Sequence, residues 1–218
     1  MFLASGLALW KIKFLPELIL TLWMIEMTRV FEGKIRVDYN QAYVLVGEID
    51  PPDLYDAFRG QTNGLCGAAV RGALWLITGL HTGRVGFTID VLDAPPPLHD
   101  AWEEIVEASF FVGYIDPDPI EDTDIEFMMD DPDVRVMLMQ WGREASYELP
   151  LPPENYRARY CARGMQLGRD RGTLLSGEDL IDFYSLAFWP AEPEPDCIIK
   201  QTSEIAAYWH NLAQSLHS

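Results

Sequence analysis

The chain has 218 residues and is 49% hydrophobic, so it can bury the core of one domain, and wholesale disorder is not expected. Its formal net charge of −18 at pH 7 argues against nucleic-acid binding, because a nucleic-acid binder neutralises phosphates with Lys and Arg. The same charge disfavours an anionic membrane surface as a partner.

Residues 1–28 are predicted to be an extension ahead of the folded domain. Their apolar run, FLPELILTLWMIEM, is interrupted by Pro16 and Glu17. It is about a dozen residues long, whereas a helix that spans a bilayer needs about 20, so stable membrane insertion is not expected. Two interpretations stay open: translation starts at Met27, or the extension forms a packed or membrane-touching helix.

Residues 29–190 are predicted to form a mainly β domain, an antiparallel β-sandwich of about 7–9 strands. The segment KIRVDYNQAYVLVG predicts one strand or two short ones, and GALWLITG predicts a buried strand. RVGFTIDVLD predicts a half-buried strand, with Val85, Phe87, Ile89 and Val91 on one face. The three prolines of DAPPPLHD exclude regular structure at that point.

The second half of this domain also alternates between apolar and polar residues. WEEIVEASFFVG predicts a strand, and VRVMLMQWG and EASYELPL predict a hairpin around a Gly-Arg turn. PPENYRARYCARG places Tyr156, Ala158, Tyr160 and Ala162 on one face of a further strand. The last strand is predicted in DLIDFYSLAFWP. Turn signals between these segments are typical of an antiparallel sandwich or barrel.

Residues 191–218 are predicted to be a linker followed by a C-terminal helix. PAEPEPD is an acidic linker stiffened by proline. The helix is predicted in KQTSEIAAYWHNLAQSL, where Thr202 or Ser203 can cap it. Its apolar stripe predicts that it folds back on the sandwich, and a docking helix for a partner groove is the alternative. The stripe consists of Ile205, Trp209, Leu212 and Leu216.

Five segments carry a resemblance to a known family: IRVDYNQAYVL, GLCGAAVRGALWLITGLHTGRVGFTIDVLD, EIVEASFFV, ASYELPLPPENYRARYCARG and EDLIDFYSLAFW. Together they cover roughly residues 35–190, and they resemble the competence protein J family, whose founding member inhibits a nuclease of DNA uptake. The chain departs from that pattern in the long stretch from Pro95 to Asp133 and in Asn155, which replaces a turn glycine. The resemblance implies a small β-sandwich binding protein without its own chemistry, and nuclease inhibition by analogy.

Catalysis is not expected, and no cofactor is expected. Cys66, Cys161 and Cys197 form neither a disulfide framework nor a zinc spacing, which favours a reducing cytoplasm. A cryptic hydrolase, kept as an alternative, would need Cys66 or Cys161 beside His81 or His99.

Carboxylates in the sequence raise two further kinds of site. A calcium loop from Asp122 would need Gly and Glu where Phe127 and Asp133 stand, so no metal site is predicted. Carboxylates beside Trp102 are compatible with glycosidase chemistry or with a solvated strand face. They are Glu103, Glu104 and Glu107. A small-molecule or carbohydrate-binding sandwich, with its site near Trp102 or Trp141, stays open as an alternative function.

The charge is unevenly spread along the chain. No Lys or Arg lies between Arg84 and Arg135, whereas 15 Asp or Glu do. Basic residues follow instead in the strand of Arg157, Arg159 and Arg163. These arginines are predicted to form exposed ion pairs with part of the acidic segment, residues 116–133, and an anion site on their face is the alternative. The split predicts a polarised molecule that attracts a cationic partner, and acidic loops that only keep the protein soluble are the alternative.

The acidic segment DPDPIEDTDIEFMMDDPD, residues 116–133, is predicted to be a protein-binding surface. Its carboxylates would speed encounter, and its apolar residues would hold the complex. The protein is therefore predicted to be a non-catalytic, cytoplasmic inhibitor or immunity-type partner of a basic protein such as a nuclease. The predicted partner-binding residues are Asp116, Asp118, Glu121, Asp122, Asp124, Glu126, Phe127, Met128, Asp130 and Asp131.

Overall fold

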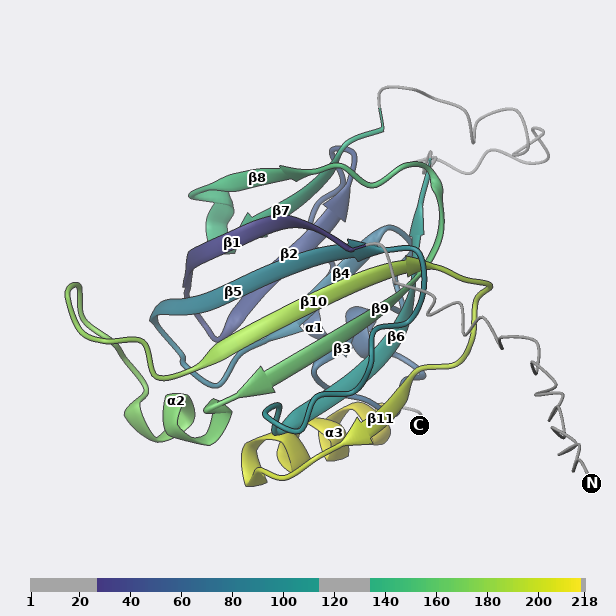
Figure 1. The fold of residues 1–218 in the computed structure, drawn as a ribbon. Coiled ribbons are helices and arrows are strands. Elements are labelled where there is room, and N and C mark those ends of the chain that lie inside the picture. The colour runs from purple at the N-terminus through teal and green to yellow at the C-terminus, as the bar shows by residue number, and fades with distance from the viewer. Residues whose placement is uncertain (1–26, 114–133, 217–218) are drawn as a thin grey trace, which may run out of the picture.

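The computed structural model describes residues 27–113 and 134–216, which form two facing β-sheets with three α-helices around them (Figure 1). The described residues contain eleven strands, so the mainly β prediction is confirmed, with more strands than the predicted number. The six-stranded sheet has the order β1 (Met27–Val37), β5 (Gly83–Leu92), β10 (Phe183–Pro190), β9 (Glu154–Arg163), β6 (Glu104–Val112) and β11 (Cys197–Lys200).

The five-stranded sheet has the order β3 (Cys66–Gly67), β4 (Ala73–Ile77), β2 (Gln41–Val46), β7 (Val136–Gln140) and β8 (Ser146–Leu149). The helices are α1 (Leu54–Phe58), α2 (Met165–Arg171) and α3 (Glu204–Ser215), and a short 3-10 turn, η2 (Trp141–Arg143), joins β7 to β8. The predicted hairpin is therefore confirmed as β7 and β8, which pair antiparallel.

The core lies between the two sheets and follows the predicted alternation. On β5, Val85, Phe87 and Ile89 are buried in this core, whereas Val91 is only partly buried. On β9 the predicted inward face is confirmed, and Tyr160 stacks on Tyr184 of β10 with ring centroids 5.6 Å apart. Burial of these large aromatic side chains, together with the aliphatic side chains around them, stabilises the fold.

The segment KIRVDYNQAYVLVG forms two strands in different sheets. β1 belongs to the six-stranded sheet and β2 to the five-stranded sheet. Tyr39 and Asn40 join them with φ angles of 56° and 54°. Asn tolerates this left-handed region, and Tyr adopts it only rarely. The turn therefore carries the chain from one layer to the other.

Two features of the six-stranded sheet differ from the prediction. β10 runs parallel to β5, so the sheet is mixed and not wholly antiparallel. A strand's apolar alternation reports which face is buried but not the direction of its neighbour. β11 follows the predicted last strand and pairs with β6. It escaped detection because a four-residue edge strand carries too little pattern.

The C-terminal helix is confirmed as α3, and it packs against the sandwich as predicted. The Ser203 hydroxyl accepts a hydrogen bond from the Ala206 amide at 3.2 Å, which caps the helix. Figure 1 shows α3 beside α2 and β11. Ile205 and His210 are buried, and Trp209 packs against the core from a partly buried position.

His210 is a buried imidazole whose Nδ1 accepts a hydrogen bond from the Gly64 amide at 2.9 Å. This approach requires glycine, because a Cβ on Gly64 would lie 1.9 Å from the Trp209 carbonyl oxygen. Burial lowers the pKa of His210 from 6.5 to about 4. His210 is therefore neutral in the folded protein at neutral pH.

This pKa makes stability depend on pH. Between pH 6.5 and about 4 the unfolded chain binds a proton at His210 more readily than the folded chain does, so folding weakens as the pH falls. Between pH 7 and pH 4 the free energy of unfolding of the wild type should therefore fall more than that of His210→Asn. We expect the difference to be on the order of 3 kcal/mol. Denaturant titrations from pH 7 to pH 4 measure it, with His81→Asn, at an exposed histidine, as the control. Parallel curves for the wild type and His210→Asn would contradict the assignment.

Candidate functional site

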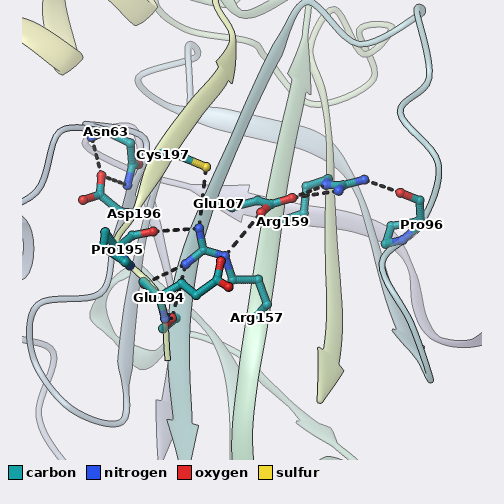
Figure 2. Close-up of polar contacts among 10 residues, drawn as sticks. Asn63, Pro96, Glu107, Arg157, Arg159, Glu194, Pro195, Asp196 and Cys197 are labelled. Carbon is teal, nitrogen blue, oxygen red and sulfur yellow. Dashed lines mark hydrogen bonds and ion pairs between the residues drawn. The ribbon is translucent and has the colours of Figure 1, made fainter. Parts of the chain in front are cut away.

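The outward face of the six-stranded sheet, which points away from the core, is organised by Glu107. Its carboxylate on β6 receives two arginines from β9. Arg159 reaches Oε1 through Nε at 2.8 Å and Nη2 at 2.7 Å, and Arg157 reaches Oε2 through Nε at 3.3 Å. The arginine side chains are 10% and 5% exposed, so these are buried ion pairs. Figure 2 shows Glu107 between them.

Arg157 ties the C-terminal tail to the sheet. It donates hydrogen bonds to the carbonyl oxygens of Glu194 at 2.9 Å and Pro195 at 2.8 Å. Asp196, the next residue, accepts hydrogen bonds at Oδ2 from the Asn63 amide at 2.6 Å and the Asn63 side chain at 3.0 Å. The proline-rich segment therefore crosses the sheet edge in a fixed position before β11 begins (Figure 2).

Arg159 extends in the opposite direction from Arg157 and donates a hydrogen bond to the carbonyl oxygen of Pro96 (Figure 2). Its guanidinium also lies 5.2 Å from the ring centroid of Trp189. The proline-rich chain after β5 is thus held over the outward face. The prediction of exposed ion pairs is wrong for Arg157 and Arg159, because their carboxylate partner lies on the neighbouring strand and both side chains are buried.

A cavity of about 670 Å³, here called the outward cavity, lies on the same face. Its lining includes Phe183 on β10, Cys161 on β9, and Leu98 and Trp102 from the chain between β5 and β6. The alternative of a small-molecule site near Trp102 therefore has a cavity of suitable size. A second hollow of about 560 Å³ is lined by Trp141, together with Tyr43 and Trp75.

The cysteine–histidine pairs that the alternative of a cryptic hydrolase requires do not form. Cys66 and Cys161 are buried, and burial raises the pKa of each thiol to about 12. His81 bonds to the Thr82 hydroxyl and His99 accepts from the Ala101 amide, and no cysteine of the described ranges bonds to a histidine. A thiol that is protonated at neutral pH is a poor nucleophile.

The three glutamates beside Trp102 hold neighbouring segments in place. Glu103 accepts from the Gly164 amide at 2.8 Å, just before α2. Glu104 is 0% exposed and accepts from the Thr202 and Ser203 amides at 3.0 and 2.8 Å, just before α3. Glu107 binds the arginines. The three carboxylates thus serve different segments, which is not the facing pair that a glycosidase needs.

Several predicted sites fall outside the described residues. They are the N-terminal extension before Met27, the calcium loop from Asp122, and all the predicted partner-binding residues between Asp116 and Asp131. Within the described ranges, no group of three or more His, Cys, Asp or Glu side chains could hold a metal ion. No helix in the same ranges has the length and apolarity to cross a membrane.

No protein-family model and no curated protein matches the sequence. Two solved structures are similar to the chain. One is ComJ from Bacillus subtilis, an inhibitor of the DNA degrading activity of NucA, with 12% identity, a TM-score of 0.47, and coverage of 76% of this chain and 99% of that chain. The other is described as crocagin biosynthetic gene J, with 12% identity, a TM-score of 0.42, and coverage of 77% and 99%. The predicted resemblance to the competence protein J family thus recurs as a distant likeness of structure, from which neither a partner nor an activity follows.

Sequence reasoning placed an alternative small-molecule site near Trp102 but missed the other residues of the outward cavity, although its strands were predicted. The cavity residues lie at outward positions of separate strands, and only the register brings them together. The sequence signal was a set of small residues at outward positions, Gly86 on β5 and Ser185 and Ala187 on β10, where a solvated sheet face usually carries larger polar side chains.

Glu107 supplies a test of this arrangement. We expect Glu107→Gln to lower the free energy of unfolding by about 3 kcal/mol, because it leaves two buried guanidinium groups without their carboxylate. Glu148→Gln, an exposed residue on β8, is the matched control and should change it by less than about 0.5 kcal/mol. Urea titrations of the three proteins measure the effect. Equal stabilities of the two variants would show that the pair contributes nothing.

Proposed function

We propose that the protein is a non-catalytic binding protein whose acidic surface takes a basic protein partner such as a nuclease. The observation that carries the proposal is the concentration of charge. Residues 116–133 hold nine acidic and no basic residues, and they connect β6 of one sheet to β7 of the other. Such a field raises the rate of encounter with a cationic partner.

The described residues where this segment leaves and rejoins the sandwich support the proposal. Glu154 pairs with Val112 at the end of β6, and Glu48 follows Gly47, whose amide bonds to the Arg135 carbonyl oxygen ahead of β7. These carboxylates extend the acidic surface beyond the segment, although Arg135 offsets part of their charge.

The state of the candidate nucleophiles also favours binding over catalysis. Both thiols that a cryptic hydrolase would use are buried and protonated at neutral pH. The resemblance to a nuclease-inhibitor family suggests a nuclease as the basic partner. The proposal itself rests on the charge and not on that resemblance.

The test is capture of a partner by the tagged full chain from lysate of the native cells, followed by assay of the partner's DNA degradation with and without the protein. We expect a basic nuclease that binds at low salt, is released at high salt, and is inhibited by the protein. Neutralising Asp122, Asp124 and Glu126 to Asn, Asn and Gln should weaken binding about tenfold, since each exposed pair contributes about 0.5 kcal/mol.

The control removes the same charge from exposed residues at the opposite end of β9, around α2 and α3. It consists of Asp170→Asn, Asp179→Asn and Glu204→Gln, and it should leave binding within about twofold of the wild type. A partner that binds both triple variants equally, or that is neither basic nor released by salt, would contradict the proposal.

A further inference from the structure

The outward cavity is built on one row of residues that crosses four strands. The register pairs Lys34 of β1 with Gly86 of β5, Gly86 with Phe183 of β10, and Phe183 with Arg163 of β9. These positions therefore lie on one face of the sheet, with the Cα atoms of Lys34 and Arg163 about 14 Å apart at the ends of the row. All four residues line the cavity.

The apolar part of the cavity is shaped by close packing along this row. A Cβ on Gly86 would lie 2.5 Å from the Phe183 ring, so the ring lies directly over the glycine. The next row consists of the smaller residues Thr88, Ser185 and Cys161, whose short side chains leave space above the sheet for the cavity. Leu98, whose side chain is largely exposed, and Trp102 line the cavity from the segment between β5 and β6.

Two of the cations in the lining are already paired. Arg29 binds Asp90 at 2.8 Å and Glu32 at 2.9 Å, and Arg159 binds Glu107. The side chains of Lys34 and Arg163 form no ion pair or hydrogen bond with any other residue of the described ranges.

Arg163 is nevertheless held in place. Its guanidinium lies 4.6 Å from the centroid of the Phe183 ring and 6.0 Å from that of Trp102. These aromatic faces orient the side chain without neutralising it, so its five N–H donors remain available to an anion.

We propose that the outward cavity binds a small amphipathic anion, with an apolar body over Phe183 and Ser185 and a carboxylate, sulfonate or phosphate group on Arg163. Lys34, at the far end of the row, adds attraction to the same charge. The proposal does not depend on the proposed protein partner. It assigns the cavity a ligand opposite in charge to that partner.

Charge complementarity decides the class of ligand. The lining holds four cationic side chains against two carboxylates, whereas the whole chain carries a net charge of −18. A cationic ligand would find better sites on the acidic surface. An anion is repelled by most of the chain and is attracted to the cavity, where cations outnumber carboxylates. The volume of about 670 Å³ lies within the range of known small-ligand sites, about 300–1,000 Å³.

Two dyes with the same aromatic body test the proposal by fluorescence titration of the full chain. Anilinonaphthalene sulfonate carries one anionic group, and phenylnaphthylamine lacks it. We expect Arg163→Gln to weaken the sulfonate about tenfold, because a charge-assisted hydrogen bond is lost, and to leave the neutral dye within about twofold. Lys34→Gln should weaken the sulfonate by a smaller factor of about three.

Two further variants show whether the dye occupies this cavity. Ser185→Leu fills the floor and should weaken both dyes. Arg135→Gln removes an exposed cation just before β7 of the other sheet and should change neither dye. Equal thermal unfolding midpoints across the variants confirm that the fold is kept. The proposal is overturned if the wild type binds neither dye, if Arg135→Gln matches Arg163→Gln, or if Ser185→Leu leaves both affinities unchanged.

Discussion

Glu107 holds two buried arginines that reach in opposite directions across the outward face of the six-stranded sheet. Arg157 fixes the chain that leads into β11, and Arg159 fixes the chain that covers the outward cavity. Both of these segments are rich in proline, which removes backbone donors and prevents them from pairing as regular strands. Through these two arginines, Glu107 links two segments that sheet pairing alone would leave loose.

Charge is separated on this scaffold, and the separation suggests two kinds of partner. The acids gather between Arg84 and Arg135 in the sequence, and half of the net charge lies in residues 116–133 alone. The outward cavity has the opposite balance, with Lys34 and Arg163 unpaired within the described part of the chain. A basic protein and a small anion would therefore be attracted to different surfaces and would not compete for the same charges.

The sequence predicted the parts of the fold that local patterns report. The alternation on β5 and β9 identified their buried faces, and Ser203, one of the two predicted caps, starts α3. The sequence did not predict which distant residues come together. No local pattern shows that Glu107 faces both Arg157 and Arg159. Nor does any local pattern show that Lys34 and Arg163 share a row across four strands. The same limit explains why the arginines were expected at the surface.

Hydrogen–deuterium exchange on the wild type and Glu107→Gln tests most directly whether this carboxylate holds both flanking segments. The prediction is faster exchange in both segments, at the amides of Trp102 and Glu103 on one side and of Glu194 and Ile198 on the other, with the core amides of β5 less affected. Acceleration confined to one side, or spread evenly over the whole sheet, would contradict the claim that Glu107 organises the outward face.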